Sequence, residues 1–196
     1  MGKQSTTEKS SRVDFSRQLL VAMPGMVSGS LADTVIFICE HNDQGALGVV
    51  INRPTDMTVG DLLERIDLEL SLEIGLTQNA PVFFGGPVQT DRGFVLHSPA
   101  RAYNSSINLG EIALTTSRDV LQEVAEGKGP DDLLITLGYA GWGPGQLEEE
   151  MSQNAWLHVQ ANHDILFATP ADERYGAALA QLGIDPIMLT GHAGRA

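Results

Sequence analysis

Residues 34–51 read TVIFICEHNDQGALGVVI and carry the clearest strand–turn–strand pattern in the chain. Two apolar runs rich in β-branched residues, 34–41 and 46–51, flank the polar linker Asn42-Asp43-Gln44-Gly45. Asn, Asp and Gly favour tight turns, whereas β-branched residues favour strands. The stretch therefore predicts a β-hairpin.

Strands and helices alternate irregularly on both sides of this hairpin. Further strands are expected at residues 18–23, 81–84, 93–97, 112–115, 133–137 and 155–160. Helices are expected after Thr58, after Thr116 or Ser117, from near Gln146 and from Pro170. Because strands dominate the first half and no βαβ repeat appears, this order predicts an α+β fold with a mixed or antiparallel sheet.

Two of these helices carry end signals. Thr58 followed by Asp61 is typical of an N-terminal cap, in which the two side chains bond each other's backbone N–H groups. Pro170 opens the last helix and Gly183 closes it. The side chains expected to face inward from that last helix are Tyr175, Leu179 and Leu182.

The composition predicts one soluble domain. Of 196 residues, 42% are hydrophobic, which is enough apolar material for a core without disulfides or metals. We expect a disordered tail at 1–14, one domain at 15–190 and a short C-terminal tail at 191–196. A single cysteine, no secretory signal and no run of 18 apolar residues predict a cytoplasmic protein with no membrane contact.

The net charge argues against direct nucleic-acid binding. Twelve Lys and Arg stand against 25 Asp and Glu, a formal charge of −13. Residues 1–12 hold three cations and one anion, so the remainder carries −15. Binding to DNA draws much of its affinity from cations that displace counterions from phosphates. A body this acidic disfavours a polyanionic partner.

Cys39 and His41, at the end of the first hairpin strand, suggest a nucleophile. Strand alternation places these two side chains on one face and those of Glu40 and Asn42 on the other. A Cys–His pair can form a reactive thiolate. Side chains two apart on a strand lie ~6–7 Å from each other, however, too far for a direct hydrogen bond. The spacing favours a buried cysteine and a structural histidine.

The five histidines do not predict a metal site. They are His41, His97, His158, His163 and His192, and they form no recognised ligand spacing. His158 and His163 fall on opposite faces of a strand and ~140° apart on a helix. We therefore expect neither a metal nor a cofactor.

The glycine-rich segment 138–145, GYAGWGPG, follows a predicted strand and precedes a predicted helix. Phosphate-binding loops occur in this context, but the spacing matches neither standard motif and no lysine is near. Glu148, Glu149 and Glu150 at the helix start would repel a phosphate. We expect a tight turn with Trp142 packed beneath it, and the open alternative is a site for an uncharged or cationic ligand.

Polar side chains also lie beside strand ends at Asn52, Arg53, Gln89 and Arg92. Arg53 and Arg92 are two of only twelve cations, and either could bind an anion. Alternatively, each pairs with a carboxylate of this acidic protein, which is the interpretation we favour.

Three segments together resemble the bacterial YqgE/AlgH family. They are FICEHNDQGALGVVINRP (37–54), VFFGGPVQTDRGFVLHS (82–98) and LGYAGWGPGQLEEEMSQNAWL (137–157), and the similarity runs from about Leu19 to Leu189. The resemblance implies a bifurcated sheet, partly barrel-like and surrounded by helices. It supplies no catalytic residue, although one branch of the family is labelled a transcriptional regulator. Matching positions that could share a polar surface are Glu40, His41, Asn42, Asn52, Arg53, Arg92, His97, Trp142, Gln146, Glu148 and Asn154.

Three functions follow from these observations. The leading hypothesis is a non-enzymatic binding or regulatory protein that acts through protein or small-molecule contacts. The first alternative is a hydrolase or transferase with a polar pocket of Glu40, His41, His97 and Glu148. The second is a structural or assembly partner, which predicts an exposed apolar patch or an oligomer interface.

Overall fold

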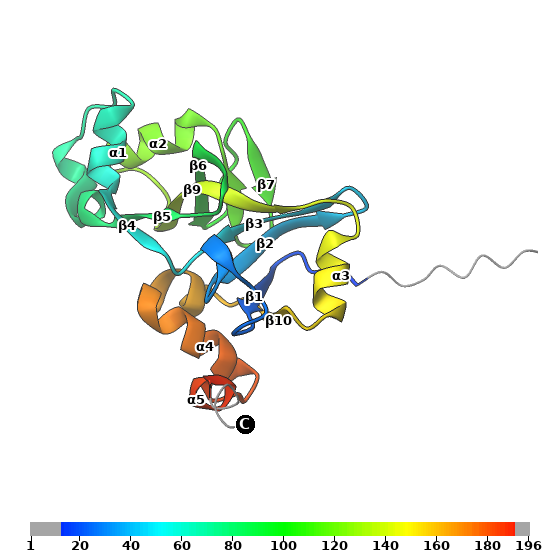
Figure 1. The fold of residues 1–196 in the computed structure, drawn as a ribbon. Coiled ribbons are helices and arrows are strands. Elements are labelled where there is room, and N and C mark those ends of the chain that lie inside the picture. Colours follow the sequence, from blue (N-terminus) through cyan, green and yellow to red (C-terminus); the bar gives the residue numbers. More distant parts are fainter. Residues whose placement is uncertain (1–12, 191–196) are drawn as a thin grey trace, which may run out of the picture.

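The computed structural model describes residues 13–190, in which ten strands form one curled sheet with helices around it (Figure 1). The strands are β1 (Gln18–Ala22), β2 (Val35–Asn42), β3 (Gly45–Val50), β4 (Pro54–Thr58), β5 (Pro81–Phe84), β6 (Val88–Ser98), β7 (Ser106–Asn108), β8 (Ala113–Thr115), β9 (Asp132–Trp142) and β10 (Trp156–Gln160). Residues 1–12 of the expected N-terminal tail and the expected tail at 191–196 lie outside the described residues.

The sheet follows the order β10-β1-β2-β3-β9-β6-β8-β7, with β4 and β5 attached beside β9. Only β5 and β9 pair in parallel among the described strands, and all other pairs are antiparallel. The sheet curls into a half-barrel. The mixed α+β class and the barrel-like sheet are therefore confirmed.

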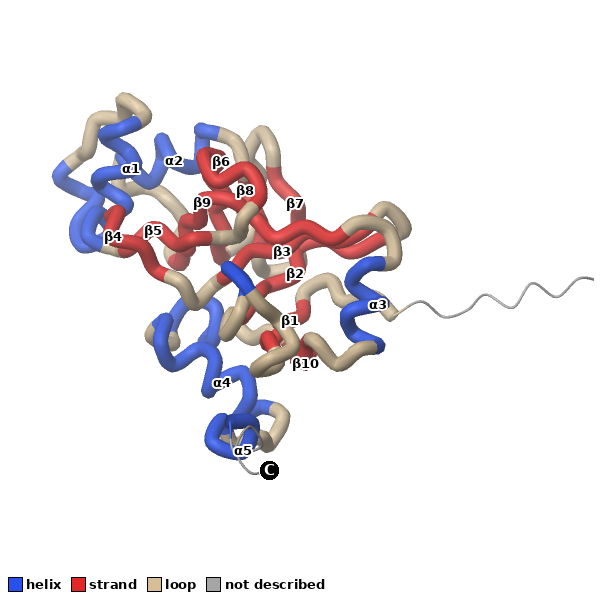
Figure 2. The backbone as a smooth tube through the Cα atoms, in the orientation of Figure 1, coloured by secondary structure: helices blue, strands red, loops and turns tan. Residues whose placement is uncertain are grey.

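The helices are short and lie around the sheet (Figure 2). They are α1 (Val59–Arg65), α2 (Arg118–Ala125), α3 (Gln146–Ser152), α4 (Arg174–Gln181) and α5 (Pro186–Thr190), with single-turn or irregular helices η1 (Gly29–Leu31), η2 (Leu72–Asn79), η3 (Asp164–Ala168) and η4 (Ala171–Glu173). Within residues 13–190, no helix has the length and apolar character needed to cross a bilayer.

Local sequence signals place most of these elements correctly. Thr58 and Asp61 form the predicted reciprocal cap at the start of α1. The prediction that Leu182 faces inward is wrong, because α4 ends one residue earlier and leaves this side chain 39% exposed. Strands β4 and β7 were not predicted, since they are short and mostly exposed and so carry no apolar alternation.

The predicted hairpin is β2 and β3, which pair antiparallel from Ile36–Val50 to Asn42–Gly45. Its turn is closed by Asn42, whose Oδ1 accepts the N–H of Gln44 at 2.8 Å. Gly45 has φ +129°, and a side chain there would collide with the carbonyl of Trp142 on β9. Glycine therefore allows the hairpin tip and the end of β9 to approach closely.

The sheet bifurcates at β9, as the family resemblance implies. Along one edge β9 pairs with β6, while its other edge pairs first with β5 at residues 136–137 and then with β3 at 140–142. Gly138, with φ +77°, lies where the partner changes, and a side chain there would collide with the carbonyl of Gly86.

This geometry corrects the prediction of a tight turn over segment 138–145. The strand continues through this glycine-rich stretch to Trp142, and only Gly143–Gly145 form the turn into α3. Gly138 allows the backbone of β9 to pass close to that of Gly86. This is a tertiary requirement that a single sequence does not reveal.

Three apolar clusters hold the fold together. One fills the inner face of the curled sheet and receives α4, the second lies under α3, and the third lies between the sheet and α1 and α2. Fully buried members such as Phe37, Leu20 and Leu63 represent these clusters in turn. Each such side chain contributes about 1.5–3 kcal/mol through burial.

Candidate functional site

The predicted polar residues concentrate where α3 packs beside the hairpin end of the sheet (Figure 1). Helix α3 anchors itself through Leu147, which is buried in the second apolar cluster. Its two flanking carboxylates, Glu148 and Glu150, reach back to residues of β2, β9 and β10. We call the resulting set, with His41, Trp142, Gln146 and Trp156, the α3 cluster.

His41 is held on both ring nitrogens. Its Nδ1 accepts the backbone N–H of Phe15 at 3.1 Å, and its Nε2 lies 3.2 Å from Oε1 of Glu148. Because Nδ1 accepts, the neutral ring carries its proton on Nε2 and donates it to Glu148. The side chain is only 3% exposed, and its ring stacks at 5.4 Å on Phe15. His41 therefore has no nitrogen free for a substrate.

Glu150 ties together two strands and the helix. Its Oε2 accepts the indole N–H of Trp142 at 2.9 Å and that of Trp156 at 2.8 Å. Its Oε1 accepts the amide of Gln146 at 3.0 Å. The sequence predicts Glu150 only at the helix start, and this role in joining the strands was not predicted. Two tryptophans, each needing an acceptor when buried, were the available signal.

The predicted placement of Cys39 and His41 on one face is wrong. A β-bulge lies between Ile38 and Glu40, so the alternation of β2 inverts after Cys39. Cys39 belongs to the inner apolar cluster, whereas His41 stacks on Phe15 of the cluster under α3. Burial raises the pKa of the Cys39 thiol far above its usual range. This cysteine is a structural residue, as the spacing argument favoured.

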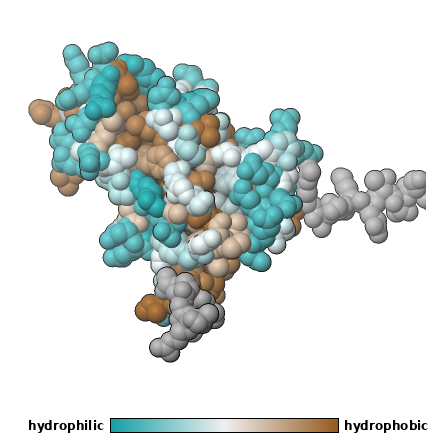
Figure 3. All heavy atoms as spheres, viewed as in Figure 1, coloured by the Kyte–Doolittle hydropathy of each residue, from teal (hydrophilic) through white to brown (hydrophobic). Residues whose placement is uncertain are grey.

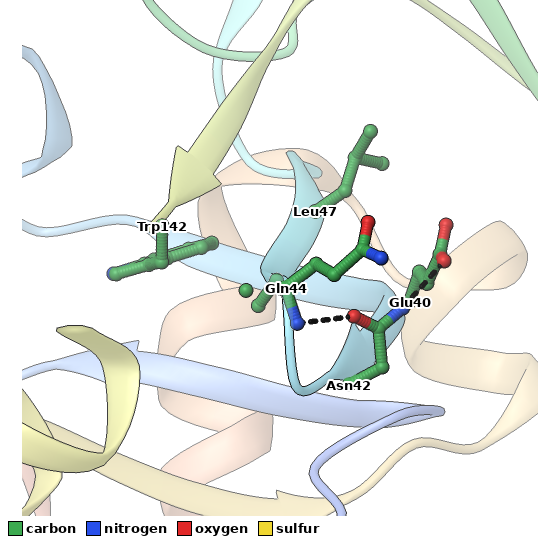
Figure 4. Close-up of a pocket in the computed structure, with 7 residues that line it drawn as sticks. Glu40, Asn42, Gln44, Leu47 and Trp142 are labelled. Carbon is green, nitrogen blue, oxygen red and sulfur yellow. Dashed lines mark hydrogen bonds between the residues drawn. The ribbon is translucent and has the colours of Figure 1, made fainter. Parts of the chain in front are cut away.

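A shallow notch of about 180 Å³ lies at the hairpin tip (Figure 4). Figure 4 shows Glu40 and Leu47 on the two hairpin strands and Gln44 in the turn between them, with Trp142 across from them on β9. Asn42 donates its amide to Glu40 at 2.7 Å. The notch is lined by Glu40, Asn42, Gln44, Gly45, Ala46, Leu47 and Trp142.

His97 lies apart from the α3 cluster, on β6. Its Nδ1 is 3.1 Å from the carbonyl of Pro99 and its Nε2 is 2.9 Å from Oγ1 of Thr115. The ring is fully buried and packs edge-on against Tyr103 at 5.3 Å. Burial lowers the pKa of His97 below 6.5, so the neutral ring is favoured. Its contacts include none of Glu40, His41 and Glu148.

The remaining candidates have local partners of their own. Asn52 accepts the N–H of Val35 at 2.8 Å and so joins the end of β3 to the start of β2. Asn154 has φ +58° and ends the turn after α3, with its N–H donated to the carbonyl of Met151. Neither side chain reaches the notch.

The favoured pairing of Arg53 and Arg92 with carboxylates is wrong for the part of the chain that the structure describes. Arg53 donates to the carbonyl of Ala32, and Arg92 to Gln89 at 3.3 Å and Thr116 at 3.4 Å. Neither has a carboxylate within 4 Å among residues 13–190. Both guanidinium groups therefore stay available to solvent.

Metal-ligating side chains do not gather anywhere in residues 13–190, where no three His, Cys, Asp or Glu groups converge. One histidine with two carboxylates near it is His163, which lies 2.9 Å from Oδ2 of Asp132 and 3.9 Å from Oδ1 of Asp164. All three side chains are substantially exposed.

Comparison with known proteins gives one consistent answer. The AlgH-like family model matches residues 19–187. A UPF0301 protein of Bordetella petrii is 67% identical over 93% of this chain and 90% of its own length, and one of Cupriavidus metallidurans is 53% identical over 94% and 96%.

Solved structures agree with these relatives. The solution structure of AlgH from Pseudomonas aeruginosa is 45% identical over the whole of both chains, with a TM-score of 0.77. The crystal structure of protein DIP2367 from Corynebacterium diphtheriae is 19% identical over 94% of each chain, with a TM-score of 0.69, and shares the fold.

Proposed function

The chain belongs to the AlgH-like family, and we propose that it is a non-enzymatic, regulatory binding protein whose partner is another protein. The observation that carries this proposal is the closure of the α3 cluster. His41, Glu148 and Glu150 would be the first choices for acid–base chemistry, yet each is bonded to another group of the cluster or to backbone. General acid–base work requires such groups to reach a substrate.

The notch at the hairpin tip supports a protein partner over a metabolite. Its volume of about 180 Å³ is below the range of ~300–1,000 Å³ that is typical of small-molecule sites. Glu40 and Gln44 are exposed beside the half-buried Leu47, so polar groups border an apolar patch. That arrangement resembles the centre and rim of a protein interface. The acidic body favours a partner with a basic surface.

Site-specific photocrosslinking tests this surface. A photoreactive phenylalanine analogue replaces Gln44 at the notch or, as the control, the exposed Gln122 on α2. We expect a discrete protein adduct in living cells from position 44, which the added substitution Leu47→Asp abolishes. Equal labelling from both positions, or no adduct from position 44, would reject the notch as the docking surface.

Direct DNA binding would contradict the proposal. Fluorescence anisotropy with random duplex at 50 and 200 mM salt should show no saturable binding, because the net negative charge of the body repels the phosphates. Tight binding that weakens ~10³-fold or more between these salt concentrations would instead indicate a phosphate-contacting surface.

The enzyme alternative depends on the His41–Glu148 contact, the one link among its four proposed residues that falls within hydrogen-bond distance. His97 has separate partners, Thr115 on β8 and Pro99 directly after β6. If the protein were an enzyme at this site, the variant His41→Gln would lose turnover in a metabolite screen while keeping its fold. We expect no turnover by wild type or variant.

The assembly alternative has one observation in its favour. Leu72 and Leu76 on η2 are 103% and 86% exposed, and the face in Figure 3 shows hydrophobic atoms at the end of the molecule that holds α1. Size-exclusion chromatography with light scattering tests it. A stable oligomer that Leu72→Ser and Leu76→Ser together dissolve would support assembly through this patch.

A further inference from the structure

A second and larger cavity lies between the start of β5, the first half of β9 and the C-terminal segment η3–η4–α4. Its volume is about 320 Å³, and apolar side chains form most of its wall, among them Val59, Phe83, Leu134, Phe167 and Pro170. This size falls at the lower end of the range for small-molecule sites. One charged side chain, Arg174, also lines it.

Among the Lys and Arg residues of 13–190, Arg174 is the one that is buried, with only 6% of its surface exposed. Its Nε donates to the carbonyl of Thr169 at 2.9 Å, and its Nη1 donates to the carbonyl of Ile51. Its guanidinium lies 5.2 Å from the centre of the Phe83 ring. These contacts fix the group rigidly against one wall of the cavity.

No carboxylate among residues 13–190 lies within 4 Å of this guanidinium. Asp172 and Glu173 directly precede Arg174, but both are exposed and neither pairs with it. Burial lowers the pKa of Arg174 to about 10, so the group remains charged at neutral pH. A buried charge without a counter-charge is costly, and proteins normally pair it.

The guanidinium keeps unused donors. The two backbone carbonyls occupy Nε and one N–H of Nη1, whereas Nη2 has no hydrogen-bond partner within residues 13–190. Within residues 13–190, the one side-chain nitrogen or oxygen atom that is fully buried and lacks a hydrogen-bond partner is Thr136 Oγ1. Nη2 also lacks a partner, so it is not fully buried. The open space beside Arg174 is the cavity that it lines.

A purely structural role explains only part of this arrangement. Arg174 does connect the end of β3 to the C-terminal segment through two carbonyls. Two neutral N–H donors would satisfy the same carbonyls without the cost of a buried charge. The remaining donors and the apolar space in front of them are what a planar, bidentate anion site requires.

We propose that this cavity binds a small organic monoanion, a carboxylate with a compact apolar body. The carboxylate would accept hydrogen bonds from Nη2 and the free N–H of Nη1, and the apolar body would pack among Phe83, Leu134 and Phe167. One cation in an acidic protein favours a single negative charge over a phosphate. This site is separate from the hairpin notch and goes beyond the function proposed there.

Titration of the ¹⁵N-labelled protein with phenylacetate and with the neutral phenylacetamide tests the site. We expect saturable amide shifts at Phe83, Leu134 and Arg174 with phenylacetate, and affinity for phenylacetamide at least about tenfold lower. Equal affinity for the two probes, or no saturable shifts with phenylacetate, would overturn the proposal.

Two variants separate charge from volume. Arg174→Gln removes the charge and keeps N–H donors, and Ala171→Leu fills the cavity while Arg174 stays. Each should reduce phenylacetate affinity at least about tenfold, whereas Arg53→Gln on the exposed surface should leave it unchanged. If Arg174→Gln does not fold, Ala171→Leu and the neutral probe still decide the outcome. Unchanged affinity in a folded Arg174→Gln or in Ala171→Leu would overturn the site.

Discussion

The α3 cluster and the Arg174 cavity both place ionisable groups against the apolar core, but within residues 13–190 the charge has partners in the first and none in the second. In the α3 cluster Glu150 accepts three hydrogen bonds and Glu148 faces a histidine N–H. In the cavity Arg174 meets two carbonyls and no carboxylate. An ionisable group whose hydrogen bonds and charge are satisfied within the protein contributes to stability. An ionisable group with unused hydrogen-bond donors beside a cavity is available to a ligand.

The largest loss of stability is expected from disrupting the α3 cluster, in which the charged groups are paired. Glu150→Ala leaves the indole N–H groups of Trp142 and Trp156 without their acceptor. Each buried, unpaired donor costs about 1–3 kcal/mol, so the free energy of unfolding should fall by about 3–5 kcal/mol. Urea denaturation followed by tryptophan fluorescence measures this loss.

Glu150→Gln is the matched control for that substitution. It keeps one acceptor oxygen and the volume of the side chain, so the loss should be about half as large. If Glu150→Ala cost less than about 1 kcal/mol, the hydrogen bonds of Glu150 would not be what holds the α3 cluster together.

A smaller loss of stability is expected at Arg174, the unpaired charge beside the cavity. Arg174→Met removes two hydrogen bonds to carbonyls but also removes an uncompensated buried charge. These terms oppose each other, so the loss in unfolding free energy should stay within about 1–2 kcal/mol in buffer without carboxylate. Urea denaturation of the same kind gives the value.

The difference between the losses of unfolding free energy for Glu150→Ala and Arg174→Met tests the comparison. A loss for Arg174→Met as large as that for Glu150→Ala would mean that the guanidinium is fully compensated in the fold. The cavity would then have no charge to offer a ligand.

The sequence predicted what depends on neighbours along the chain. The hairpin of β2 and β3 and the cap of α1 follow from turn residues and a Thr–Asp spacing, and both are confirmed. The bulge at Cys39 was not predictable, because strand alternation assumes unbroken pairing with a partner that the sequence does not specify. That single residue moved His41 to the other face.

The site depended even more on distant contacts. Glu150 joins side chains from β9, α3 and β10, and Arg174 reaches a carbonyl 123 positions earlier in the chain. Arg174 also lies in a helix with ordinary amphipathic spacing, so nothing local distinguishes it from a surface arginine. Its burial follows from how α4 packs against β1 and β2, which brings the guanidinium beside Phe83 of β5.

The smallest effect concerns His97, a buried group that is neither closed by a carboxylate nor open to a cavity. Burial, the largest cause, lowers its pKa below 6.5, so the unfolded chain takes up this proton at higher pH than the folded protein. The free energy of unfolding should therefore fall as the pH drops below about 6.5 and level off once the folded-state ring is protonated.

The slope of unfolding free energy against pH that His97 contributes should correspond to the uptake of no more than one proton. Thermal melts of wild type and His97→Gln between pH 7.5 and 5 isolate it, because the variant lacks this titration. The Asp61 carboxyl does not interfere, since a hydrogen bond from the Thr58 backbone holds its pKa below 3.8. Parallel stability curves for the two proteins would mean that His97 keeps its ordinary proton affinity, and that burial alone does not decide the charge of a group which the fold neither pairs nor exposes.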